Sequence, residues 1–300
     1  MAAFDRPLIA LSLTEPDEEL LRYASLVADM FEWSDVHFTH VLAVADSGDA
    51  PDPQPSRIKL EADVDRAFAR SAASRPPSLH VAHGSRLDAL LGLAVRHERD
   101  VIMLGHRRTR SGRRSLARRL AMLAPSSVWL VPEGSPPRIN SILVPTDFSQ
   151  HSADALSVAV DVARAAGLKE CRAVHVFFDP STVRYDEHVE EVVGREETAF
   201  EEFLAGVDTH GIRVEPILRE STHPGQAILR VAENCGSDLI VMNTRGRSHT
   251  ASLLLGSVTS DAMAGTTVPL LAVKHYGSHM TALQAILNHR FWDEKAPKSN

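Results

Sequence analysis

Short apolar runs alternate with longer amphipathic segments along the whole chain. The run at 239–242, Leu-Ile-Val-Met, is bounded by polar residues, as expected for a buried parallel strand. In the longer segments, apolar residues recur three and four positions apart, which predicts helices. Strands that alternate with helices are typical of an α/β fold in which helices cover both faces of a parallel sheet.

The pattern predicts the same series of elements in each half of the chain. In the first half, strands are expected at 7–13, 36–44, 79–81, 100–104 and 127–131, and helices at 14–31, 57–73 and 86–97. In the second half, strands are expected at 142–144, 172–178, 212–218, 239–242 and 269–273, and helices at 152–166, 183–206 and 224–234. A last helix begins at Gly256-Ser257 and ends near Gly265.

The two halves form an internal repeat. Asp100 begins a strand in the first half and Asp238 begins its counterpart, while Val131 matches Val273, so the offset grows from about 138 to about 142 residues. The 300 residues are enough for two domains of about 150 residues each. We therefore expect domains at 1–134 and 138–276, joined by a short stiff linker and followed by a helical tail at 277–300.

The segment 238–273 carries the clearest candidate chemistry. It reads as strand, glycine-containing loop, helix and strand. Gly246 lets the backbone approach a ligand closely, and Gly256-Ser257 begins the helix, so free N–H groups point into the loop. Such a helix end favours anions. The alternative is a strand-to-helix connection that uses glycine only for its turn.

The spacing of these residues resembles the ATP-binding members of the universal stress protein family, which carry Gly-x2-Gly-x9-Gly-Ser/Thr. Here the pattern is Asn243-x2-Gly246-x9-Gly256-Ser257, with asparagine at the first glycine position. The segment 142–149, ILVPTDFS, resembles the first strand of the family and its adenine-side loop. The resemblance implies a tandem protein with two doubly wound domains, each a five-stranded parallel sheet in the order 3-2-1-4-5.

The same resemblance implies a nucleotide site between the first and fourth strands of the second domain. Its cofactor would be ATP with Mg²⁺, although ADP and AMP remain open. Pro145, Thr146 and Asp147 match the adenine and ribose side, and Val176 matches an apolar contact to adenine. The positions that match the phosphate side are Asn243, Gly246, Arg247, Gly256, Ser257, Val258 and Thr259. Structural alternatives remain, because Val176 is suited to a core and Asp147 to capping a helix.

The first repeat departs from this pattern. Gly105 takes the place of Asn243, and arginines take the place of the two later glycines in a loop four residues shorter. Asp147 corresponds to Ser12 or Leu13, depending on one gap. We therefore expect a degenerate first domain that does not bind nucleotide. Its replacement loop lies in the basic run 107–119, with seven arginines, which we interpret as a solvated helix start rather than an anion-binding patch.

Composition excludes several classes of protein. A net charge of −7 argues against a dedicated nucleic-acid binder, and no apolar run approaches the roughly 18 residues of a membrane span. Cys171 and Cys235 provide no disulfide framework, which favours a cytoplasmic protein. The pairs His37/His40 and His80/His83 lack the spacing of a zinc site, so no metal ligands are expected.

Three functions fit the sequence. The first is a nucleotide-binding stress or regulatory protein with little or no catalysis, because there is no catalytic set such as Gly-x4-Gly-Lys-Ser/Thr or Gly-x-Ser-x-Gly. The second is a slow ATP hydrolase or nucleotidyl-transfer enzyme, and the third is a nucleotide-free interaction scaffold. The last strand of each repeat would lie at a sheet edge, so the two repeats are expected to pair through them, and a homodimer of whole chains is a further expectation.

Overall fold

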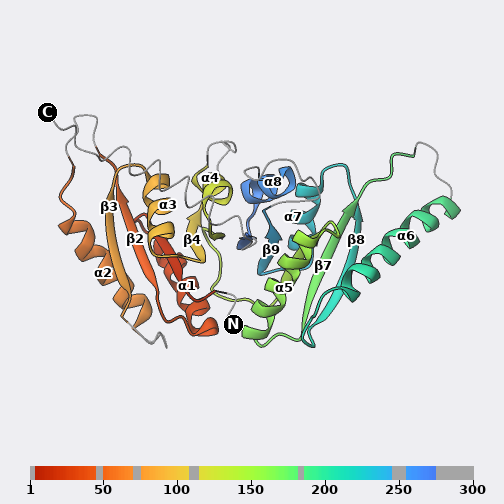
Figure 1. Ribbon diagram of the computed structural model, residues 1–300, viewed down its shortest axis with the longest axis horizontal. Helices are drawn as coiled ribbons and strands as arrows, with labels where there is room; N and C mark the ends of the chain where they lie inside the picture. The colour runs from red at the N-terminus through yellow and green to blue at the C-terminus, as the bar shows by residue number, and fades with distance from the viewer. Residues whose placement is uncertain are drawn as a thin grey trace.

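The computed structural model describes residues 4–44, 50–69, 76–107, 115–181, 186–244 and 255–274. These residues form an α/β fold with the two halves side by side (Figure 1). The strands are β1 (Pro7–Leu11), β2 (His37–Leu42), β3 (Ser78–His83), β4 (Val101–His106), β5 (Ser127–Pro132), β6 (Ile142–Thr146), β7 (Glu170–Phe177), β8 (Arg213–Glu220), β9 (Leu239–Asn243) and β10 (Leu270–Val273). The helices are α1 (Asp17–Phe31), α2 (Gln54–Phe68), α3 (Arg86–Arg96), α4 (Leu116–Leu123), α5 (Gln150–Ala165), α6 (Asp186–Ala205), α7 (Pro224–Asn234) and α8 (Ser257–Gly265).

All the strands of the described residues belong to one sheet in the order β3-β2-β1-β4-β5-β10-β9-β6-β7-β8. Within each half the paired strands are parallel, and each half has the order 3-2-1-4-5 counted along the chain. This confirms the predicted fold class of two doubly wound domains. In such a sheet, the strand order reverses between the first and fourth strands, which leaves a crevice at their carboxyl ends.

Residues alternate between the two faces along each strand, as the pleat requires. In β4, Val101 and Met103 enter one hydrophobic core while Ile102 and Leu104 enter the other. Side chains of α1, α2, α5 and α6 complete the first core, and those of α3, α4, α7 and α8 complete the second. Both cores continue from one repeat to the other, while the edge strands β3 and β8 are half-buried or exposed.

The repeats are joined through their last strands, because β5 pairs with β10 in antiparallel register. Trp129 lies opposite Leu271, and both are fully buried in the first core. Just past β10, the Lys274 ammonium donates hydrogen bonds to the carbonyl oxygens of Met122 at 3.0 Å and Ala124 at 2.6 Å. A cation at the carboxyl end of α4 interacts favourably with the helix dipole, so Lys274 ties the second repeat to a helix of the first.

The predicted element bounds differ from the structure by a few residues. The helix α2 differs at both ends: it begins at Gln54, where the prediction placed 46–56 in a proline-rich loop, and it ends at Phe68, before the predicted end at 73. The predicted start was wrong because Pro55 lies in the first helical turn, where its missing N–H costs no hydrogen bond. Within the described ranges, every helix is too short or too polar to cross a bilayer. The predicted tail helix at 277–300 lies outside the described residues.

Candidate functional site

The loop that follows β6 is held by bonds between near neighbours. Oδ1 of Asp147 accepts hydrogen bonds from the backbone N–H of Ser149 at 3.1 Å and from its hydroxyl at 2.6 Å. The same Ser149 is the N-cap of α5, since its Oγ accepts from the N–H of Ser152 at 3.2 Å. Oγ1 of Thr146 accepts from the N–H of Phe148 at 3.1 Å. Asp147 and Thr146 are thus fixed where the chain leaves the sheet.

Asn243 lies at the same edge of the sheet, because β6 and β9 are paired parallel strands. Its side-chain amide donates to the carbonyl oxygen of His151 at 2.9 Å, which ties the end of β9 to the first turn of α5. Its own carbonyl oxygen accepts from the hydroxyl of Thr259 in α8 at 2.8 Å. The structure therefore brings Asp147, Asn243 and Thr259, three residues far apart in sequence, to one end of the crevice.

The segment between β9 and α8 is closed at its base. The N–H of Thr244 donates to the carbonyl of Val273 at 3.1 Å, and the N–H of Gly256 donates to the carbonyl of Thr244 at 3.0 Å. Thr244 and Gly256, the described residues at the two ends of this segment, are therefore held together. The predicted site residues Gly246 and Arg247 belong to this loop and lie outside the described residues.

The start of α8 differs from the start of α4, its counterpart in the first repeat. Ser115 caps α4, because its Oγ accepts from the N–H of Arg118 at 3.3 Å. The N-cap of α8 is Gly256, and within the described part of the chain no side chain caps this helix. Ser257 is exposed and Val258 is half-buried. Within the described ranges, no side chain occupies the first N–H groups of α8, and the positive end of the helix dipole favours an anion there.

The remaining predicted site residues lie on β6 and β7, where successive side chains face opposite sides of the sheet. Val176, near the end of β7, is half-buried and packs against the second core. The adjacent His175 directs Nδ1 to the carbonyl oxygen of Thr146 at 2.8 Å, and its ring stacks on Phe148 at a centroid distance of 4.1 Å. Pro145 is buried in β6. The predicted adenine-side residues are therefore neighbours across β6 and β7.

Comparisons with known proteins show the family of this chain. Residues 138–274 match the model of the universal stress protein family. Over 135 residues, 45% of this chain, the sequence is 32% identical to a universal stress protein of Thermus aquaticus and covers 98% of that protein. The chain belongs to the universal stress protein family.

Solved structures resemble the whole chain of this universal stress protein. A universal stress protein from Archaeoglobus fulgidus DSM 4304 superposes with a TM-score of 0.67 at 18% identity, covering 91% of this chain and 97% of that chain. A functionally unknown protein from Pseudomonas aeruginosa PAO1 superposes with a TM-score of 0.70 at 15% identity, covering 96% and 98%. At these identities the similarity shows the shared fold, which in both cases spans the two repeats.

The structure settles which residue of the first repeat of this universal stress protein matches Asp147. Leu13 and Phe148 both have positive φ, 58° and 63°, so they occupy the same place in the two loops. Asp147 therefore corresponds to Ser12. The match is supported by a repeated hydrogen bond between a histidine Nδ1 and the carbonyl oxygen at the end of the first strand: His40 with Leu11 at 3.0 Å, and His175 with Thr146 at 2.8 Å.

The cleft of the first repeat is open, with a cavity of about 520 Å³ at the ends of β1 and β4. Three carboxylates, Asp17, Glu19 and Glu133, are among its lining residues. Asp17 is buried and accepts a hydrogen bond from the hydroxyl of Ser12 at 2.9 Å, and Arg107 pairs with Glu133 at 3.0 Å. The crevice of the first repeat therefore holds both acidic and basic side chains, with Asp17 and Glu133 already engaged.

The start of α8 is positioned by a close approach to α7. A Cβ atom on Gly225 would lie 2.7 Å from Cβ of Asp261 and 3.2 Å from the carbonyl oxygen of Val258. We expect Gly225→Ala to lower the free energy of unfolding by about 1–3 kcal/mol, because the two helices must separate. Urea denaturation followed by circular dichroism measures this change.

The matched control for Gly225→Ala is Gly194→Ala in α6, where an added Cβ meets nothing within 4 Å. This control should raise stability by about 0.5–1 kcal/mol, since alanine favours a helix over glycine. Equal effects of the two substitutions would contradict the tight contact between α7 and α8.

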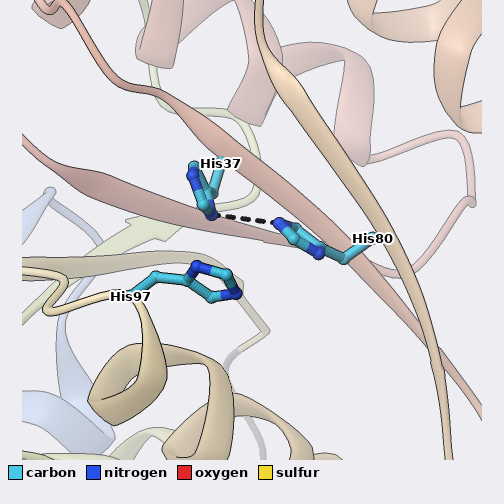
Figure 2. A group of neighbouring side chains, drawn as sticks. All are labelled: His37, His80 and His97. Carbon is cyan, nitrogen blue, oxygen red and sulfur yellow. Dashed lines mark hydrogen bonds between the residues drawn. The ribbon is translucent and has the colours of Figure 1, made fainter.

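A second group of chemically active side chains lies in the first repeat, toward the amino-terminal ends of β2 and β3. His37 begins β2, His80 lies in β3 and His97 follows α3, and one ligand atom from each lies within 4.8 Å of the others (Figure 2). We call these three residues the histidine cluster. Nε2 of His80 is 3.0 Å from Nδ1 of His37. His37 is buried, and the other two rings are half-buried.

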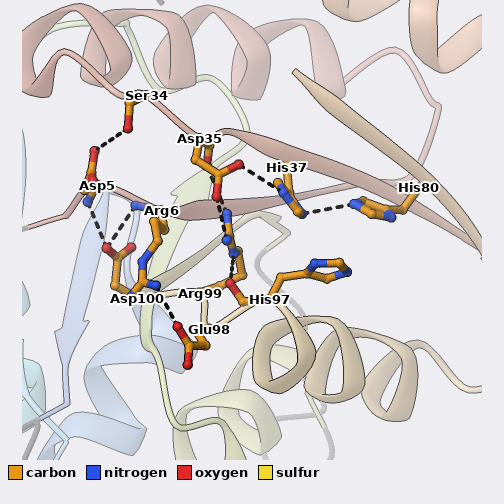
Figure 3. A network of polar contacts seen from close by, with 10 residues as sticks. All are labelled: Asp5, Arg6, Ser34, Asp35, His37, His80, His97, Glu98, Arg99 and Asp100. Carbon is orange, nitrogen blue, oxygen red and sulfur yellow. Dashed lines mark hydrogen bonds and ion pairs between the residues drawn. The ribbon is translucent and has the colours of Figure 1, made fainter. Parts of the chain in front are cut away.

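The cluster is connected to an ion pair (Figure 3). Nε2 of His37 is 3.1 Å from Oδ1 of Asp35, and Oδ2 of Asp35 accepts from the guanidinium of Arg99 at 2.7 Å. Burial alone would raise the pKa of Asp35, but pairing with Arg99 holds it below its usual value. Burial, together with neighbouring positive charge, lowers the pKa of all three histidines, that of His80 to about 4. The rings are therefore neutral at pH 7.

Sequence reasoning missed this cluster. The expectation of no metal ligands considered His37 with His40 and His80 with His83, pairs close in sequence. In the structure, His40 bonds the carbonyl of Leu11 and His83 bonds that of Pro51. His80 reaches His37 because β2 and β3 pair with Thr39 opposite His80. Strand register, had it been assigned at the outset, would have placed two of the three rings together.

Proposed function

We propose that this chain binds ATP in its carboxy-terminal repeat and acts as a nucleotide-responsive stress or regulatory protein that hydrolyses ATP slowly or not at all. The observation that carries the proposal is the exposed start of α8, which no side chain of the described residues caps and which Thr259 ties to the carboxyl end of β9. An anionic ligand at this point gains both hydrogen bonds from the backbone and the field of the helix.

The surrounding residues fit the parts of a nucleotide. Half-buried Val176 offers an apolar contact to adenine, and Asp147 offers a carboxylate to the ribose hydroxyls. Asn243, Gly246, Arg247, Gly256, Ser257 and Val258 match the phosphate side in the family pattern, and we assign them to the phosphates and their Mg²⁺. Thr259 is buried, and its hydroxyl supports the carbonyl of Asn243. On this proposal, 138–276 is the nucleotide-binding domain and 1–134 its degenerate partner.

The contacts of Asp147 argue for slow turnover. Its Oδ1 already accepts two hydrogen bonds from Ser149, which orient the carboxylate along its own loop. A general base needs to reach the attacking water at hydrogen-bond distance, and this arrangement favours holding a ligand over activating water. We therefore place ATP hydrolase or nucleotidyl-transfer activity second.

The function is tested on the full chain. Mass spectrometry of ligand released from purified protein identifies the nucleotide, isothermal titration calorimetry measures its affinity, and a coupled assay measures ADP formation. The proposal is supported if ATP binds and dissociates from the protein faster than it is hydrolysed. Fast production of ADP would show instead that the protein is an ATP hydrolase. Absence of a heat of binding for ATP, ADP and AMP would favour the nucleotide-free interaction scaffold.

Asp147→Asn tests the ribose side. We expect ATP to bind about tenfold more weakly, because the amide keeps an oxygen for Ser149 but loses the charge that strengthens hydrogen bonds to hydroxyls. Calorimetry at constant salt measures the change. The control is Asp161→Asn on α5, whose carboxylate pairs with Arg164 at 3.8 Å on the helix surface and should leave ATP affinity unchanged.

A further inference from the structure

The histidine cluster has the donor set of a transition-metal site. Neutral imidazole nitrogen is the commonest protein ligand for Zn²⁺ and related ions. In a tetrahedral zinc site, two ligand nitrogens lie about 3.4 Å apart, given zinc–nitrogen bonds of about 2.0–2.1 Å. Nδ1 of His37 and Nε2 of His80 are already 3.0 Å apart, and a nitrogen of His97 lies within 4.8 Å of both. A small rotation of the rings would bring all three around one ion.

The polar network behind His37 sets the tautomer that a metal requires. Asp35 is acceptor-only when ionised, so at 3.1 Å from its Oδ1 the Nε2 atom of His37 carries the proton. Nδ1 of His37 is then unprotonated and accepts a hydrogen bond from Nε2 of His80, so metal binding requires the proton of His80 to move to its Nδ1. A carboxylate that accepts from the remote nitrogen of a ligating histidine is the usual arrangement outside a metal centre, where it fixes the ring and raises its basicity.

Arg99 holds the two sides of the cluster in position (Figure 3). Its guanidinium is buried and donates to the backbone carbonyl of Asp35 at 3.0 Å and to that of His97 at 2.6 Å. It therefore ties the segment before His37 to the end of α3, which carries His97. The positive charge of Arg99 is compensated by Asp35, and the nearby Arg57 and Arg96 are exposed, where solvent screens them.

We propose that His37, His80 and His97 bind a divalent late first-row transition ion, Zn²⁺ foremost, with Asp35 and Arg99 as the supporting shell. Three protein ligands leave a fourth position for water, which the half-buried rings of His80 and His97 admit. The ion would link β2, the edge strand β3 and the end of α3. The site lies at the amino-terminal edge of these strands, opposite the proposed nucleotide crevice, and so stands independently of it.

Co²⁺ is the direct probe, because its visible absorption is intense in four-coordinate sites and weak in the six-coordinate complexes of scattered surface ligands. We expect metal-stripped full-length protein to develop the intense spectrum with one equivalent of Co²⁺ and to lose it when one equivalent of Zn²⁺ is added. Competition against a chromophoric chelator gives the Zn²⁺ affinity. Failure of the wild-type protein to develop the intense absorption would overturn the proposal.

Substitutions assign the site. We expect His80→Ala and His97→Ala each to weaken Zn²⁺ binding by roughly 100-fold, and Asp35→Asn by roughly 10-fold, as supporting residues commonly do. His83→Ala is the matched control, because His83 is an exposed histidine of the same strand outside the cluster. Loss of binding in the cluster variants with retention in the control supports the site. Wild-type affinity in both cluster variants would place the ion elsewhere and refute it.

Thermal unfolding keeps the result interpretable if a variant is less stable. An ion that binds only the folded state raises the melting temperature in proportion to its affinity and concentration. Zn²⁺ should therefore raise the midpoint of the wild-type protein and of His83→Ala, and leave that of His97→Ala unchanged. Equal shifts in all three proteins would contradict the assignment.

Discussion

Replacing Trp129 by alanine should lower the free energy of unfolding by about 3–5 kcal/mol, the largest stability effect we expect of a single core substitution. The side chain is fully buried in β5, where its ring meets those of Phe4 and Tyr23 at centroid distances of 6.2 Å and 6.1 Å. It also lies opposite Leu271 of β10, across the junction of the repeats. Its loss would therefore leave a cavity where the two halves share one core.

Urea denaturation followed by far-ultraviolet circular dichroism measures this loss. Trp129→Phe should cost less than Trp129→Ala because the phenyl ring fills part of the space. The surface control is Ile58→Ala in α2, whose side chain is 66% exposed and whose removal should change stability by no more than about 0.5 kcal/mol. Similar destabilisation by Trp129→Ala and Ile58→Ala would show that packing at the junction of the repeats contributes little to the free energy of unfolding.

Most of the fold follows from patterns that are local in sequence. The run at 239–242 is β9 with one residue added, and the segment predicted at 224–234 is α7. Short apolar runs between amphipathic segments leave few alternatives to a parallel sheet with helices on both faces. The start of α2 was missed because the pattern alone cannot tell a proline in a first helical turn from a proline in a loop.

The candidate site was only partly predictable. Asp147 and the start of α8 carry motifs that a sequence displays directly. The hydrogen bonds of Asn243 to His151 and Thr259 join residues that are distant in sequence, and such contacts depend on how the strands are ordered. The histidine cluster is the extreme case, since it needs the register of β2 on β3 and the position of the end of α3 together.

Ser257→Asp should abolish ATP binding at ordinary concentrations if phosphates lie at the start of α8. Ser257 is the first residue of α8 and is exposed. A carboxylate about 4 Å from a phosphate costs about 2–4 kcal/mol at the effective dielectric of a protein surface, which raises the dissociation constant roughly 30- to 1,000-fold. The same charge stabilises the helix by about 0.3–1 kcal/mol through its dipole, so the protein should remain folded.

Calorimetry with ATP separates this effect from its alternatives. Ser257→Ala removes the hydroxyl without adding charge and should weaken binding only a few-fold, which isolates the electrostatic part. Ser157→Asp makes the same substitution at an exposed position of α5 in the same repeat and should leave the affinity within about twofold. If Ser257→Asp binds ATP as tightly as Ser157→Asp does, the negative charge of the nucleotide does not lie against α8, and the proposed phosphate site at the start of this helix is wrong.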